Sequence, residues 1–161
     1  MELSQSLCAK HPGGVRRIAL YKASKILSAT YNKSLGAFTS VEVEEGYSPV
    51  EVAFEEESAS WSESADDKGG VEHCVEFSLR GCRTMALGSL MGLSEEGIVA
   101  EVECADGERY IVGYSVEAAT LYPLRLSLGA LDTKNHKADK PTSKVRLLAT
   151  DGWYSHQLLG E

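Results

Sequence analysis

The sequence predicts a mainly β protein, a mostly antiparallel barrel or sandwich with one short helix in the middle of the chain. Three observations predict it: an alternating segment at Val71–Arg80, helical spacing of apolar residues after Gly81, and an Asp-Gly turn between the runs Ile98–Cys104 and Glu108–Val112. A sheet of this kind avoids open edges by closing into a barrel or by packing as a sandwich.

The first half of the chain contains three shorter strand candidates. Val15–Tyr21 follows the breaker Pro12-Gly13-Gly14. A second run contains Phe38, Val41 and Val43, and a third has Val50, Val52 and Phe54 alternating with Glu51, Ala53 and Glu55 after Pro49. Apolar alternation bounded by Gly and Pro indicates strands.

The segment from residue 71 to 80 has the two-residue period of a half-buried strand. Its expected inward set is Val71, His73, Val75, Phe77 and Leu79. Glu72 and Glu76 fall on the other face, where we expect them to extend a negative surface.

After Gly81 the period changes to that of a helix of about three turns. The apolar positions that fit this spacing are Cys82, Met85, Ala86, Leu90 and Leu93. Gly88 and Gly92 weaken the helix by about 1 kcal/mol each relative to Ala, so tertiary packing must hold it. The following Ala105-Asp106-Gly107 predicts a hairpin with a type I′ turn.

Leu121–Leu128 and Lys144–Thr150 bring the expected number of strands to at least seven. Two polar stretches, Ser58–Gly70 and Asp132–Pro141, are expected to be surface loops, the first interrupted by Trp61. We expect one domain over residues 1–161 with a flexible segment at 1–12, because 161 residues with 43% hydrophobic and 25% charged content match one globular core.

The chain shows no run of about 20 apolar residues and no signal-peptide pattern, so we expect no membrane association. The cysteines at 8, 74, 82 and 104 have no disulfide-framework spacing, and we expect free thiols.

Acidic residues are concentrated in one part of the chain. Residues 42–76 contain twelve acidic residues and one basic residue, Lys68, whereas the remainder contains twelve acidic and fifteen basic residues. A solvated acidic face explains this pattern. The alternative is a surface that contacts a basic partner or the basic segments of another copy, or that repels DNA. Nucleic-acid binding is disfavoured because compact basic groups are few. The candidate assembly or partner surface comprises Arg16, Arg17, Glu55, Glu56, Glu57, Trp61, Lys134, Lys137, Lys140 and Trp153.

No catalytic, cofactor or metal signature has the spacing that its chemistry requires. Cys8 and His11 could join His73 and Cys74 on zinc, but His73 and Cys74 are adjacent in a strand and point to opposite faces. A Cys-His nucleophile pair stays open because its members need be close only in space. Gly-rich phosphate loops and calcium loops are absent from the sequence. We therefore predict a non-enzymatic protein without cofactor or metal.

The order of these signals resembles small virion proteins of phages and prophages of gut Bacteroidetes. It runs from Gly13-Gly14-Val15 through Ser60-Trp61-Ser62-Glu63, the strand HCVEFSL, a short helix and the hairpin AEVECADGERYIVG to a late polar loop, over about Cys8 to Thr150. The body is similar to the tail-tube superfamily, which includes phage tube proteins, tail terminators and the type VI secretion tube protein.

The resemblance implies a tail-tube or tail-completion subunit that forms rings, commonly sixfold, with copies of itself and contacts other tail proteins. It implies assembly in the bacterial cytoplasm, a place in the virion, and an acidic lumen along which DNA slides. The arm expected between rings would be Asp132–Pro141 or Ser58–Gly70. Two alternatives remain: a monomeric or dimeric β-barrel binding module for a protein or small ligand, and an enzyme with an unrecognised site.

Overall fold

The computed structural model describes residues 14–55, 57–81, 83–115, 120–121, 123–132, 141–151 and 153–160. It is mainly antiparallel β with one α-helix in mid-chain, which confirms the predicted fold class. Two sheets have the strand orders β13-β8-β7-β1-β4 and β11-β12-β6-β5. Neither described sheet closes into a barrel, and the arrangement is sandwich-like.

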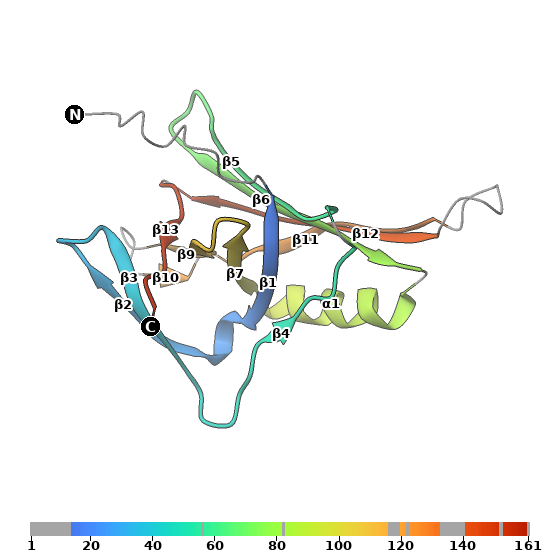
Figure 1. The fold of residues 1–161 in the computed structure, drawn as a ribbon, viewed down its shortest axis with the longest axis horizontal. Helices are drawn as coiled ribbons and strands as arrows, with labels where there is room; N and C mark the ends of the chain where they lie inside the picture. The colour runs from blue at the N-terminus through green and yellow to red at the C-terminus, as the bar shows by residue number, and fades with distance from the viewer. Residues whose placement is uncertain are drawn as a thin grey trace.

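The elements lie as Figure 1 shows. The first sheet contains β1 Val15–Lys22, β4 Val50–Glu51, β7 Ile98–Cys104, β8 Arg109–Val112 and β13 His156–Gln157. The second contains β5 Ser60–Ala65, β6 Val71–Arg80, β11 Arg125–Asp132 and β12 Thr142–Asp151. The others are the 3-10 helix Ala23–Lys25, the hairpin β2 Ile26–Asn32 and β3 Ala37–Val43, α1 Thr84–Glu96, and the pair β9 Tyr114–Ser115 and β10 Thr120–Leu121.

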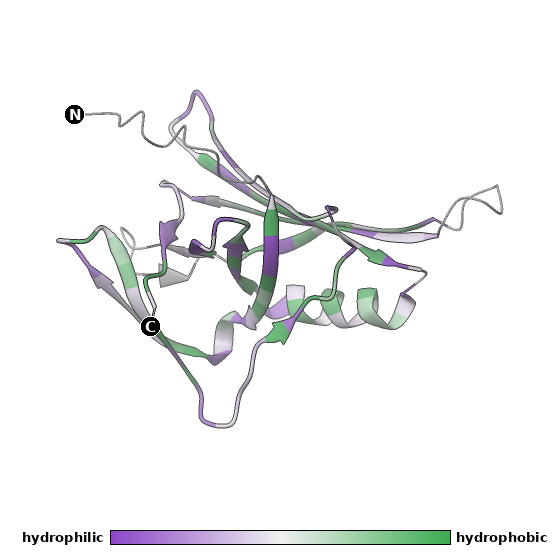
Figure 2. Ribbon diagram, in the orientation of Figure 1, coloured by the Kyte–Doolittle hydropathy of each residue, from purple (hydrophilic) through white to green (hydrophobic). Residues whose placement is uncertain are grey.

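The main core lies between the two sheets and is closed on one side by α1. Ile18 and Leu20 of β1 share one buried cluster with Val75 and Phe77 of β6 and with Leu90 of α1. Figure 2 shows apolar residues along β1 and α1, and hydrophilic residues in the turn between β3 and β4. Burial of this apolar surface between the sheets is the main force that holds them together.

A second, smaller core lies on the opposite face of the first sheet, under the β2–β3 hairpin. Phe38 is fully buried there, and its ring meets those of Tyr31 and Tyr114 edge-on, each at 5.5 Å between centroids. Both faces of β7 are therefore covered, which explains why Ile98–Val102 is buried without alternation.

The strand over residues 71–80 is confirmed, with Val71, His73, Val75 and Phe77 buried. The hairpin at 98–112 is confirmed as well, but the prediction that its turn is of type I′ is wrong. Glu57 is the one described non-glycine residue with positive φ, so Asp106 has negative φ and only Gly107, at 93°, is left-handed. Gly107 N–H donates to the Cys104 carbonyl, which makes a three-residue turn with a glycine bulge.

The prediction that Ser58–Gly70 is a loop is wrong over its first half. Residues 60–65 form β5, which pairs along its whole length with β6. The alternation was hidden because Ser60, Ser62 and Ser64 occupy the outward positions, where serine is a weak strand signal. The tip at Asp66–Gly70 is a turn held by the Asp66 carboxylate, which accepts from the backbone N–H groups of residues 68 and 70.

Other boundaries differ from the expectations. β2 was not predicted, the strand expected through Phe54 ends at Glu51, and the run expected at 121–128 is divided between β10 and β11. The helix is confirmed, but Met85 is 88% exposed and Leu87 is buried in its place. Residues 1–12, Cys82 and most of the expected loop at 132–141 lie outside the described residues.

Candidate functional site

The edge of the second sheet at β11 is unusual for an exposed strand. Between Arg125 and Asp132 it reads Leu-Ser-Leu-Gly-Ala-Leu, without a charge or a proline. Leu128 is 39% exposed and Leu131 is 44% exposed. Natural edge strands are usually protected by lysine, proline or a covering segment. Strand β11 contains neither lysine nor proline, and α1 covers it at Leu126. We call residues 125–132 the β11 edge.

The helix α1 packs against β11, and most of its length is also uncharged. Residues 84–94 contain no charged side chain, and Met85 and Met91 are 88% and 60% exposed. Ser94 fixes the helix to the β11 edge, because its hydroxyl accepts from the backbone N–H of Leu126 at 2.7 Å and its carbonyl accepts from Arg125 at 2.8 Å. Exposed Met side chains at uncharged surfaces adapt readily to a partner.

A buried polar cluster joins β5, β6 and the C-terminal segment. The Glu63 carboxylate accepts from the Ser155 backbone N–H at 2.7 Å, from the Ser155 hydroxyl, from Nδ1 of His73 and from the Trp61 indole at 3.2 Å. The side chains of Glu63 and His73 are 7% and 4% exposed. The pairing with an acceptor-only carboxylate assigns the proton of the ring to Nδ1.

Burial alone raises the pKa of Glu63, but the hydrogen bonds from His73 and from Ser155 outweigh burial and hold that pKa below its usual value of 4.5. Serine, histidine and a carboxylate are the groups of a nucleophilic triad, which needs hydroxyl and carboxylate on opposite ring nitrogens. Here both lie at Nδ1, and Nε2 is buried without a partner among the described residues. This arrangement ties the chain together and does not activate the hydroxyl.

Trp61 and Trp153 lie in different environments. Trp61 is half-buried against the main core, and its ring contacts that of Tyr110 of the first sheet in a tilted arrangement, at 4.7 Å between centroids. It therefore links the two sheets within one chain. Trp153 is 51% exposed beside Tyr154 and is free to contact a partner.

The basic candidates that are described pair with acidic residues of the same chain. Arg16 binds Glu103 at 3.1 Å and Arg17 binds Glu51. Glu55 lies 3.5 Å from Arg80, and Glu57 is exposed at a φ of 64°. Glu56 and the lysines at 134, 137 and 140 lie outside the described residues.

The sequence predicted that Glu72 and Glu76 extend a negative surface on the outward face of the second sheet. That face is not uniformly negative, because basic residues of β12 lie beside them. Glu76 pairs with Arg146 of β12, and Lys144 of β12 lies opposite Ser78 in the same register. Elsewhere in the acidic segment, Glu44 binds Lys25 at 3.0 Å. The charge imbalance along the sequence is thus partly neutralised by pairing in space.

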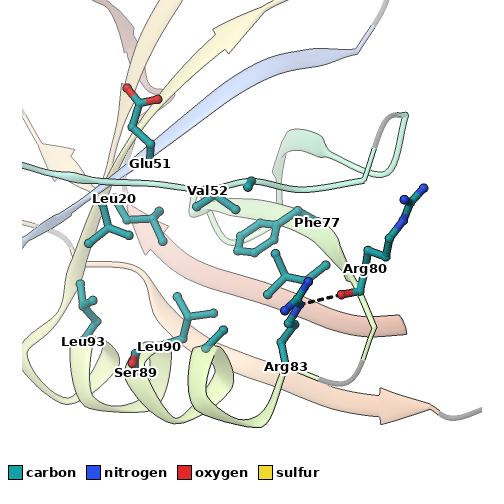
Figure 3. Close-up of a pocket in the computed structure, with 13 residues that line it drawn as sticks. Leu20, Glu51, Val52, Phe77, Arg80, Arg83, Ser89, Leu90 and Leu93 are labelled. Atoms are coloured by element: carbon teal, nitrogen blue, oxygen red, sulfur yellow. Dashed lines mark hydrogen bonds between the residues drawn. The ribbon is translucent and has the colours of Figure 1, made fainter. Parts of the chain in front are cut away.

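An apolar cavity of about 510 Å³ lies between α1, the inner face of β6, β1 and the segment 50–53 (Figure 3). Its polar groups include Arg83, which precedes α1, and Ser89 of α1. Within the described ranges, no group of three or more His, Cys, Asp or Glu side chains is placed to hold a metal ion. No helix among the described residues is long and apolar enough to span a membrane.

His73 and Cys74 do point to opposite faces of β6, so a zinc site that uses both is excluded. Burial raises the pKa of the Cys74 thiol, and the charge of Glu76 raises it further. Burial likewise raises the pKa of Cys104.

Sequence reasoning missed the β11 edge, the Glu63 cluster and the cavity. The absence of charge from Leu126 to Leu131 was a readable signal for the first. The other two depend on long-range packing. Comparisons with protein-family models, with curated proteins and with solved structures found no match for this chain.

Proposed function

We propose that this protein is a non-enzymatic structural subunit that assembles with copies of itself through the β11 edge. The observation that carries the proposal is an eight-residue edge strand with no charge between its end residues and with exposed Leu128 and Leu131. Such a strand is a template for strand addition from another chain. In a subunit that assembles, the exposed edge strand serves as the contact with the next copy.

The neighbouring surface of α1 supports the same conclusion. An exposed helix face with two Met residues and no charge over residues 84–94 has the composition of an interface core, from which charged residues are depleted. Helix and strand together offer an area that a copy could cover. The exposed Trp153 is a further candidate anchor at a subunit contact.

The resemblance to phage tail proteins gives the assembly its most specific form. In that form the chain is a tail-tube or tail-completion subunit, forms rings of commonly six copies, contacts other tail proteins and resides in the virion after assembly in the bacterial cytoplasm. The intrachain pairing of Glu51, Glu55 and Glu76 weakens a lumen role for the acidic segment as a whole.

Sedimentation velocity over a range of concentrations tests the proposal. The wild-type mass should rise above that of a monomer, and Leu128→Lys should hold the chain monomeric because a lysine on an edge opposes strand addition. Leu35→Lys is the matched control, since Leu35 is 59% exposed but lies in the β2–β3 turn. A wild-type chain that stays monomeric, or a Leu128→Lys chain that associates as the wild type does, contradicts the proposal.

A second candidate function is a binding module for a small ligand. The cavity beside α1 favours it, since 510 Å³ falls within the size range of ligand sites. The two functions are compatible, because the cavity and the β11 edge involve different residues.

A further inference from the structure

The cavity beside α1 has aliphatic walls. Its lining includes Leu20, Val52, Leu79, Leu90 and Leu93, and Phe77 contributes one aromatic ring. The segment 50–53 crosses it as a strap, held to β1 by the short strand β4 and by the Val52 N–H, which donates to the Ile18 carbonyl at 3.0 Å. Val50 is 49% exposed, so this side of the cavity opens to solvent.

The charged side chains around the cavity do not all point toward it. Arg83, at the start of α1, donates from Nε to the Arg80 carbonyl at 2.8 Å, and this bond fixes its guanidinium beside the cavity. In Figure 3 the side chains of Glu51 and Arg80 extend away from the cavity. Glu51 pairs with Arg17, and Arg80 lies 3.5 Å from Glu55. The charge presented to a ligand is therefore the positive charge of Arg83.

We propose that this cavity binds a fatty acid, with the alkyl chain between α1 and β6 and the carboxylate at Arg83. An aliphatic wall accommodates a flexible alkyl chain, and its burial supplies the affinity. A guanidinium matches a carboxylate through parallel N–H donors. Because Nε of Arg83 donates to the Arg80 carbonyl, the two terminal NH₂ groups of Arg83 remain for the ligand. Ser89 of α1 supplies a further polar group, its hydroxyl, at the cavity.

The probe for the test is sodium dodecanoate, titrated calorimetrically into the full-length chain below the detergent's micelle concentration. Dodecyltrimethylammonium and dodecanol serve as matched ligands with the same alkyl chain. Arg83→Gln removes the charge, and Arg80→Gln is the matched control on a side chain that points away. Ala86→Leu narrows the cavity from the helix side.

We expect saturable binding of dodecanoate, weakened about tenfold by Arg83→Gln and unchanged by Arg80→Gln. Dodecanol should bind equally to wild type and Arg83→Gln, and Ala86→Leu should weaken both ligands. If Ala86→Leu does not fold, amide shift changes in wild-type α1 and segment 50–53 on addition of dodecanoate must locate the site.

The proposal is overturned if dodecanoate does not saturate, if Arg83→Gln binds it as wild type does, or if dodecyltrimethylammonium binds equally well. Shift changes confined to other elements overturn it too. Dodecanoate binding that occurs only as an oligomer dissociates would identify a second copy as the occupant, and would likewise overturn the fatty-acid assignment.

Discussion

Replacing Glu63 by glutamine tests how β5, β6 and the C-terminal segment are held together. The carboxylate accepts from Trp61, His73 and both the backbone and side chain of Ser155. In Glu63→Gln one oxygen remains for the Ser155 N–H, but an NH₂ group replaces the oxygen that faces the other three donors. The donors of Trp61, His73 and the Ser155 hydroxyl would then face the NH₂ group, which is itself a donor, in a nearly solvent-free site.

The magnitude follows from the burial and number of these contacts. A single hydrogen bond to a charged group contributes about 1.5–3 kcal/mol, and a buried donor left without an acceptor costs about 1–3 kcal/mol. We therefore expect Glu63→Gln to lower the free energy of unfolding by about 3–5 kcal/mol. Because domains are stable by about 5–15 kcal/mol, this is a large part of the total.

The effect should depend on pH with a definite sign. The pKa of Glu63 is lower in the folded state than its usual value of 4.5. A carboxyl group of this kind stabilises the fold above its unfolded pKa, and the contribution is lost as the pH falls through the folded pKa. The wild-type advantage over Glu63→Gln should be complete at pH 7 and shrink below about pH 4.5.

Urea denaturation followed by tryptophan fluorescence measures both quantities, at pH 7 and at pH 4. Ser64→Ala on the same strand is the matched control, because Ser64 is exposed and its substitution should change stability by less than about 0.5 kcal/mol. A loss below about 1 kcal/mol for Glu63→Gln, or a difference that grows in acid, would refute the reasoning.

Two further predictions concern backbone geometry and thiol reactivity. Gly97→Ala should destabilise the fold by about 2–4 kcal/mol, because its φ is 91° and the added Cβ would lie 2.4 Å from Cβ of Pro123. Gly107 also has a positive φ, 93°, but an added Cβ would meet no atom within 4 Å. Gly107→Ala should therefore lower the free energy of unfolding by only about 1–2 kcal/mol, measured by thermal or urea unfolding. Equal losses of stability in the two variants would exclude the clash with Pro123 as the cause. Cys74 and Cys104 should be alkylated more slowly than free cysteine at pH 8, since burial raises both pKa values. A fast thiol at either position would reopen the nucleophile hypothesis.

The sequence predicted those elements whose two faces differ strongly. β6 was predictable because apolar and polar residues alternate along it, and the hairpin was predictable because Asp106-Gly107 separates two apolar-rich runs. β5 was missed because serine occupies its outward positions and its inward Glu63 is polar. Local pattern alone cannot show that a buried carboxylate has donors 10 and 92 residues away.

The helix illustrates a smaller error with the same cause. Its apolar residues permit more than one buried face, and packing against the β11 edge and the main core selects Leu87, Leu90 and Ser94. Met85 then faces solvent. Likewise the acidic segment is conspicuous in the sequence, but its pairing with Arg17, Lys25 and Arg146 follows only from the fold.

Self-assembly through the β11 edge is the central claim, and an image of the purified protein tests it most directly. Negative-stain electron microscopy of concentrated wild-type protein should show rings or stacked rings, and Leu128→Lys at the same concentration should show none. Compact monomers in the wild-type sample at every concentration would contradict the claim.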